Sequence, residues 1–177
     1  MIQKLIAGIL LLVLAACGAT SEGDTETPAR ANASALDYVK ISRSPCFGAC
    51  PVYELTLFGD GRQSFYGTRF TKVSGQQNGQ ASAGRFLDVV SELELRGFSS
   101  FKENYTRETC KTWATDHPSV TIEVRYGDMR KTVNWYTGCR GFDDRAALER
   151  TVEALETIMA VETFVGTDAE RAAMKRR

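Results

Sequence analysis

The sequence predicts an α+β domain in which two hairpins form an antiparallel sheet and two helices pack on one face of it. Two observations lead to this prediction. Stretches of alternating apolar and polar residues are joined by short glycine-containing turns, which is typical of hairpins. Each such pair is followed by a segment whose apolar residues recur every three or four positions, which is typical of a helix with one buried face. The order is therefore hairpin, helix, hairpin, helix.

The first half of this pattern covers residues 52–97, after a short strand at residues 38–41. Two β-rich segments meet at the three-residue turn Gly59-Asp60-Gly61, which pairs positions of equal parity. One face of this hairpin then carries Leu55, Leu57 and Phe65. Ser82 can cap the helix that follows, and Gly97 can end it. The apolar stripe of this helix consists of Phe86, Leu87, Val90 and Leu93.

The second half repeats the pattern with a shorter turn, Gly127-Asp128. A two-residue turn pairs even with odd positions, so the apolar residues of both strands again share one face. These residues are Val120, Ile122, Val124, Val133 and Trp135. Asp143 or Asp144 can cap the second helix. Its apolar stripe consists of Leu148, Val152, Leu155 and Met159.

The charge balance excludes some classes of partner. Lysine and arginine number 22, and aspartate and glutamate also number 22, so the formal net charge is zero. The chain has neither a basic surface for nucleic acid nor an acidic tail for a cationic partner, and we expect no nucleic-acid partner. A single histidine argues against a multi-histidine metal centre, and the sequence has no glycine-rich phosphate-binding loop, so we expect no metal and no cofactor.

The first seventeen residues are typical of a lipoprotein signal. Lys4 precedes an apolar run, Leu5–Ala16, which has the length of a signal-peptide core and is too short to span a bilayer. The run ends Leu14-Ala15-Ala16-Cys17-Gly18, which resembles the bacterial lipobox. The resemblance implies cleavage after Ala16 and acylation of Cys17, with palmitate among the acyl chains. Gly18 after the lipidated cysteine implies outer-membrane routing in a Gram-negative cell.

Composition then divides the rest of the chain. Residues 18–35 are mostly small and polar, so we expect residues 17–35 to be the lipidated cysteine and a flexible tether with a reach of about 20–25 Å. The folded domain is expected at residues 36–165. Residues 166–177 are expected to form a polar C-terminal tail.

Four cysteines remain after Cys17, and in an oxidising compartment an even number predicts disulfides. Three connectivities exist, and we prefer Cys46 with Cys50 and Cys110 with Cys139. Two other interpretations stay open. One is a redox pair at Cys46 and Cys50, although the spacing is one residue longer than in thioredoxin. The other is a zinc site that also uses His117.

Asp116-His117-Pro118 contains the only histidine of the chain. An acid beside a histidine is compatible with general-base chemistry, and a turn that leads into a strand is the structural alternative. We assign no catalytic residue. Exposed Phe47 or Trp113 would suit insertion into a partner, for example an enzyme that this protein inhibits.

The sequence resembles a bacterial family known only as domain of unknown function 6438. The resemblance rests on the stretch Cys46-Phe47-Gly48-Ala49-Cys50-Pro51-Val52-Tyr53, on the turn Gly59-Asp60-Gly61 and on Asp116-His117-Pro118. The resemblance covers about residues 36–165 and implies export, but it implies no activity, ligand or catalytic residue. The positions it singles out are a ligand site or a fold signature. They are Cys46, Gly48, Cys50, Pro51, Tyr53, Asp60, Gly61, Asp116 and Pro118, with His117 beside them.

These observations lead to one functional hypothesis and one alternative. The hypothesis is a non-enzymatic binding domain of an outer-membrane lipoprotein, which is anchored by lipid, faces the periplasm and binds an unidentified envelope protein. The alternative is a thiol-redox factor or small enzyme centred on Cys46 and Cys50 with Asp116 and His117.

Overall fold

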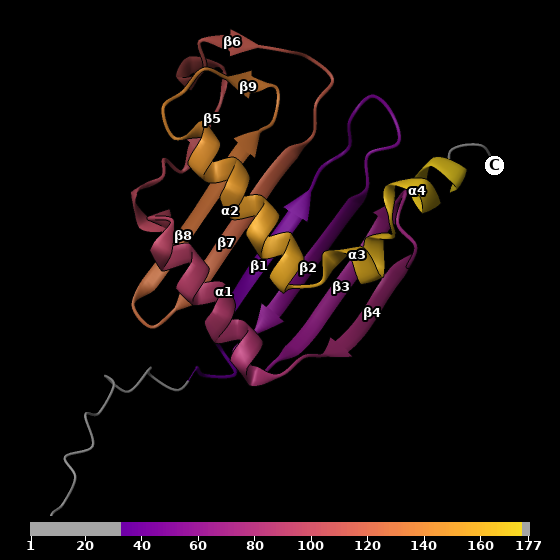
Figure 1. Cartoon of the computed structure of the whole chain (residues 1–177), viewed down its shortest axis with the longest axis vertical. Helices are drawn as coiled ribbons and strands as arrows, with labels where there is room; N and C mark the ends of the chain where they lie inside the picture. The colour runs from indigo at the N-terminus through magenta and orange to yellow at the C-terminus, as the bar shows by residue number, and fades with distance from the viewer. Residues whose placement is uncertain (1–32, 175–177) are drawn as a thin grey trace, which may run out of the picture. The chain divides into compact units, whose positions relative to one another are not determined.

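Residues 33–174, described by a computed structural model, build a seven-stranded sheet with helices on one face (Figure 1). The strand order is β4-β3-β2-β1-β7-β8-β5, and every neighbouring pair is antiparallel except β5 with β8. The strands are β1 Tyr38–Arg43, β2 Val52–Phe58, β3 Arg62–Arg69, β4 Gly75–Gln80, β5 Asn104–Tyr105, β7 Ser119–Tyr126 and β8 Met129–Tyr136. A separate ribbon pairs β6 Thr112–Trp113 with β9 Cys139–Arg140.

The registers of the two predicted hairpins agree with their turn lengths. Leu55 of β2 lies opposite Phe65 of β3, and both are fully buried. Ile122 of β7 lies opposite Val133 of β8, again with both side chains in the core. The turn length therefore set which face of each hairpin is apolar.

An α+β fold with a large antiparallel sheet is confirmed, but a sheet made of two hairpins alone is not. The strand β1 lies between the hairpins and pairs with both β2 and β7. β4 and β5 extend the two edges. The sequence of β4, Gly-Gln-Gln-Asn-Gly-Gln, has no apolar alternation because this edge strand buries little side-chain surface, so the pattern could not reveal it.

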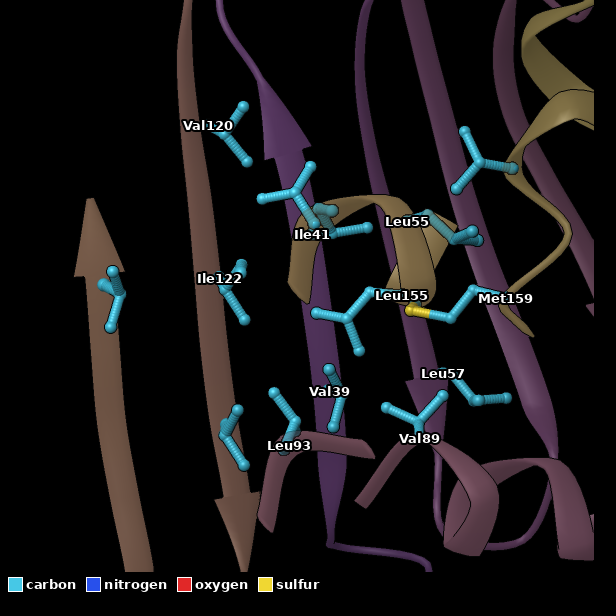
Figure 2. Packing of buried hydrophobic residues seen from close by; sticks show 14 of the residues in the cluster. Val39, Ile41, Leu55, Leu57, Val89, Leu93, Val120, Ile122, Leu155 and Met159 are labelled. Atoms are coloured by element: carbon cyan, nitrogen blue, oxygen red, sulfur yellow. The ribbon is translucent and has the colours of Figure 1, made fainter. Parts of the chain in front are cut away.

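Two helices cover the same face of the sheet, α1 Ala83–Leu95 and α2 Arg145–Ile158 (Figure 1). Figure 2 shows Val89 and Leu93 of α1 and Leu155 of α2 directed at the apolar row of the sheet. Each such side chain, when fully buried, contributes roughly 1.5–3 kcal/mol to folding. The stripe predicted for α2 is its packing surface. The stripe predicted for α1 is confirmed at Phe86, Val90 and Leu93, whereas Leu87 is only partly buried and the fully buried Val89 was not predicted.

The chain beyond α2 makes a sharp reversal. Ala160 adopts a left-handed conformation with φ 55°, and the short helix α3 Val161–Val165 follows. Phe164 of α3 stacks on Phe65 of β3 with ring centroids 4.8 Å apart. The helix α4 Asp168–Met174 lies within the predicted polar tail, and Glu170 forms an ion pair with Lys72 at 3.1 Å.

Two short 3₁₀ turns complete the described part, η1 Phe98–Ser100 and η2 Arg107–Thr109. None of the helices within residues 33–174 has the length and apolar character needed to cross a membrane. The predicted signal peptide, Cys17 and most of the predicted tether lie outside the described residues.

Candidate binding groove

A groove of about 710 Å³ lies between one end of the sheet and the helices α2 to α4. The sheet contributes the last residue of β1 and the start of β2, and the helices contribute the C-terminal part of α2 with the chain that follows. The lining residues are Arg43, Pro51, Tyr53, Glu153, Glu156, Thr157, Ala160, Val161, Glu162, Thr163, Val165, Gly166, Thr167, Asp168 and Arg171. More than 100 residues of chain separate Arg43 from the helical wall.

Local structure explains why α3 stands at the groove. The left-handed Ala160 ends α2 and turns the chain, and Gly166 with φ 85° ends α3 in the same way. The backbone amides of Lys72 and Val73 donate to the carbonyls of Val165 and Phe164 at 3.1 and 2.9 Å, respectively. These bonds hold α3 against the β3–β4 loop, so its remaining polar side chains face solvent along the groove.

A half-buried ionic cluster joins the two walls of the groove. The Nε of Arg43 donates to Glu156 Oε1 at 2.6 Å, and the Tyr53 hydroxyl donates to the same oxygen at 2.7 Å. Tyr53 is only 2% exposed, and its burial, together with the negative charge of Glu156, raises the pKa of the phenol far above its usual range. Burial alone would lower the pKa of Arg43, but the hydrogen bond and charge of Glu156 raise it. Tyr53 therefore stays protonated and Arg43 stays charged at neutral pH.

The other charges of the groove do not balance. Arg171 forms an ion pair with Asp168, and Arg43 is neutralised by Glu156. Glu153 and Glu162 also line the groove, are exposed, and have no basic partner among residues 33–174. Two guanidinium groups against four carboxylates leave the groove with two net negative charges.

The Cys46–Cys50 block lies at the same end of the sheet, in the β1–β2 loop. The two cysteines form a disulfide with Cα atoms 5.8 Å apart. Phe47 is 89% exposed at the tip of this loop, and its amide donates to the carbonyl of Asp116 at 3.2 Å. Gly48 lies at the tip beside it. Pro51 and Tyr53, the last predicted positions of the block, line the groove.

Asp116, His117 and Pro118 form a turn that supports this loop. Asp116 has φ 68°, a left-handed conformation that aspartate tolerates. The His117 amide donates to the hydroxyl of Tyr136 at 3.1 Å, and the Pro118 carbonyl accepts two bonds from Thr137. The Asp116 carboxylate accepts from Thr115 and does not bond the His117 ring. The geometry resembles a structural turn more than a general-base pair.

Asp60 and Gly61 lie at the opposite end of the sheet, about 20 Å away along the seven-residue strand β2. The Asp60 carboxylate accepts from the backbone amide and the Nε of Arg62 at 3.0 and 2.7 Å, and Arg62 lowers the pKa of this carboxyl. Gly61 has φ 86°, and a Cβ there would lie 2.3 Å from the carbonyl oxygen of Ala81. The predicted positions therefore do not form one site.

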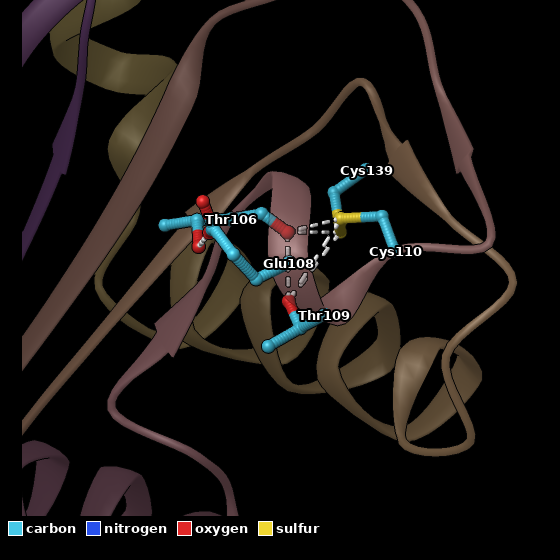
Figure 3. Close-up of a disulfide and its surroundings, with 5 residues drawn as sticks. All are labelled: Thr106, Glu108, Thr109, Cys110 and Cys139. Carbon is cyan, nitrogen blue, oxygen red and sulfur yellow. Dashed lines mark hydrogen bonds between the residues drawn. A yellow bond between two sulfur atoms is a disulfide. The ribbon is translucent and has the colours of Figure 1, made fainter.

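The second disulfide joins Cys110 to Cys139, with Cα atoms 5.2 Å apart. Figure 3 shows its sulfur atoms beside Thr106 and the 3₁₀ turn η2, which contains Glu108 and Thr109. Cys139 is fully buried. This bridge connects the approach to β7 with the chain that leaves β8. The two disulfides have the pairing that we preferred from the sequence.

Trp113 is half-buried and stacks on Tyr136 with ring centroids 4.2 Å apart, so of the two candidate inserting groups only Phe47 is freely exposed. Sequence reasoning missed the groove residues Arg43, Glu153, Glu156, Glu162 and Arg171. Each resembles an ordinary solvated charge in the sequence, and no local pattern signals that they converge. Within residues 33–174, no three His, Cys, Asp or Glu side chains gather in a way that could hold a metal ion.

Comparison with known proteins gives a family and no activity. No curated protein matches the chain. Residues 37–159, which are more than half of the chain, match the family model described as domain of unknown function DUF6438. The matched range begins one residue before β1 and ends at the cap of α2, so it includes the sheet, both long helices and the ionic cluster of Arg43, Tyr53 and Glu156. This chain belongs to the DUF6438 family.

Proposed function

We propose that this chain is a lipid-anchored envelope protein whose folded domain binds an envelope protein partner, without catalysis, on the periplasmic side of the outer membrane. The observation that carries the proposal is the groove. Its volume of about 710 Å³ lies within the roughly 300–1,000 Å³ usual for ligand sites.

The location is supported by two independent features. The run Leu5–Ala16 followed by Cys17 has the length and composition of a lipoprotein signal. Two disulfides in a domain of this size suit an oxidising compartment, because cytosolic thiols are kept reduced. Several acyl chains at one residue would provide stable anchoring without a basic surface.

Site-specific photo-crosslinking in intact envelopes tests the binding site. A benzophenone amino acid replaces Thr157 or Thr163, which are exposed and line the groove, and in a control it replaces Tyr66. Tyr66 is half-exposed on the opposite face of the sheet. We expect a defined adduct from the groove positions and none from Tyr66. Absence of an adduct at both groove positions would contradict the proposal.

Metabolic labelling tests the anchor separately. We expect the natural chain to incorporate labelled palmitate and to fractionate with the outer membrane. The Cys17→Ser variant should lose both properties and retain its signal peptide. Label that persists without Cys17 would show that the lipid is attached elsewhere or that the lipobox interpretation is wrong.

A further inference from the structure

We infer that the groove selects a segment of a partner polypeptide in which lysine or arginine side chains alternate with apolar ones. This inference rests on the proposed function and names the chemistry of the partner. The net charge of the whole chain gave no hint of it, because the charges balance globally. The local imbalance exists only where the two walls meet.

The unpaired charges of the groove favour a cationic ligand. Arg43 forms an ion pair with Glu156, and Arg171 forms one with Asp168. Glu153 on α2 and Glu162 on α3 remain without a basic partner in the described part of the chain. An anionic ligand or an anionic lipid headgroup would meet repulsion from both. A cationic group would gain from both.

Part of the groove lining is apolar. Pro51 contributes apolar lining from the sheet wall. Val161 and Val165 contribute it from the helical wall, with 6% and 3% of their surface exposed. Lysine and arginine have apolar stems with a charged end, so they cover such a lining while the charge reaches a carboxylate. Apolar side chains between them would cover the remaining apolar lining.

The volume of the groove suits a ligand larger than a single small cation. A water-sized group occupies roughly 30 Å³, so one ammonium group would fill little of a groove of about 710 Å³. The two free carboxylates are on separate helices, so a ligand with two cationic groups can pair with each of them. A short extended peptide segment meets these requirements, whereas a small single cation does not.

Fluorescence anisotropy with the full chain in detergent tests the inference. The probes are fluorescein-labelled heptapeptides that alternate lysine with leucine, or glutamate with leucine. We expect the lysine peptide to bind and the glutamate peptide not to bind. The Glu153→Gln/Glu162→Gln variant should weaken lysine-peptide binding about tenfold at low salt, at about threefold for each exposed carboxylate.

A matched control removes two exposed carboxylates from α1 with the variant Asp88→Asn/Glu94→Gln, which should bind the lysine peptide as the natural chain does. Equal binding by the groove variant, or preference for the glutamate peptide, would overturn the inference. The crosslinking experiment separates the two proposals. An undiminished Thr163 adduct in the Glu153→Gln/Glu162→Gln variant would leave the groove as a binding site and reject only the cationic partner.

Discussion

The two ends of the sheet use similar residues for different purposes. At the turn end, which we define as Asp60, Gly61 and Arg62, both carboxylate oxygens of Asp60 accept hydrogen bonds from Arg62, and the Cα of Gly61 lies close to the carbonyl oxygen of Ala81. At the loop end, which we define as residues 43–53, 116–118 and 153–171, an exposed aromatic ring and two unpaired carboxylates remain.

The positions that the family resemblance singled out fall into two groups, one at each end of the sheet. The fold itself explains the residues of the turn end, because the geometry of the turn requires them and no side chain there is without a structural role. The loop end has the same structural demands at Asp116 and the Cys46–Cys50 disulfide, and in addition it has groups that the fold does not use. Function is therefore expected there.

The largest expected loss of stability comes from opening the disulfide that closes the longer loop. Cys110→Ser/Cys139→Ser opens a bridge with a sequence separation of 29 and should lower the free energy of unfolding by about 3–4 kcal/mol. Cys46→Ser/Cys50→Ser opens a much smaller ring and should cost about 2 kcal/mol. Denaturant unfolding of both variants measures this difference.

The same pair of bridges distinguishes a structural role from the redox alternative. We expect both disulfides to resist mild reductant until the domain unfolds, as judged by thiol alkylation and mass spectrometry. If Cys46–Cys50 instead opened and closed in the native protein, the loop end would be a redox centre and the alternative would be preferred.

The next effect concerns the turn end. Gly61→Ala combines a left-handed φ of 86° with a Cβ 2.3 Å from the Ala81 oxygen, and should destabilise the domain by about 3 kcal/mol. Gly127→Ala is the matched control, because Gly127 has φ 54° with nothing within 4 Å of a Cβ, and should cost only about 1 kcal/mol. Thermal or urea unfolding compares the two. Similar losses would mean that the backbone conformation, rather than the close contact, makes Gly61 necessary.

A smaller effect is expected at the ionic cluster of the loop end. Glu156→Ala leaves the Arg43 charge and the buried Tyr53 hydroxyl without their acceptor, which should cost about 2–3 kcal/mol of unfolding free energy. Glu153→Ala, on the exposed surface of the same helix, should change it by less than about 0.5 kcal/mol. A large loss from Glu153→Ala would show that this carboxylate has a structural partner and is not free for a ligand.

The smallest effect is a pH dependence. The folded-state pKa of Tyr53 is raised, so its stabilising contribution is complete below the unfolded value of about 10 and is lost as pH rises toward the folded value. In that interval the unfolded chain binds fewer protons than the folded chain. The free energy of unfolding therefore falls by up to about 1.4 kcal/mol per pH unit per tyrosine. Unfolding of Tyr53→Phe above pH 10 should therefore decline less steeply.

Tyr105 provides the internal comparison for that experiment. Burial raises its pKa to about 12, so it contributes the same alkaline loss to both the natural chain and Tyr53→Phe. An unchanged slope in Tyr53→Phe would mean that the phenol at the loop end titrates normally, and the cluster with Glu156 would then be looser than its geometry indicates.

Local patterns predicted the hairpins and both long helices because their causes are local. The three residues between Phe58 and Arg62, and the two between Tyr126 and Met129, set the pairing parity and so the buried face. The edge strand β4 and the short helix α3 could not be predicted in this way. β4 has no apolar alternation, and the polar half of α3 resembles a loop.

By itself, the sequence determined the two central hairpins, both long helices, which of their faces are buried, and the family to which the chain belongs. Only the tertiary structure decided that β1 lies between the hairpins and that Arg43 and Tyr53 meet Glu156, more than 100 residues later. The physical reason is the distance along the chain over which each cause acts. Turn geometry and apolar periodicity act over a few residues, whereas the groove and its excess negative charge arise where distant segments pack together.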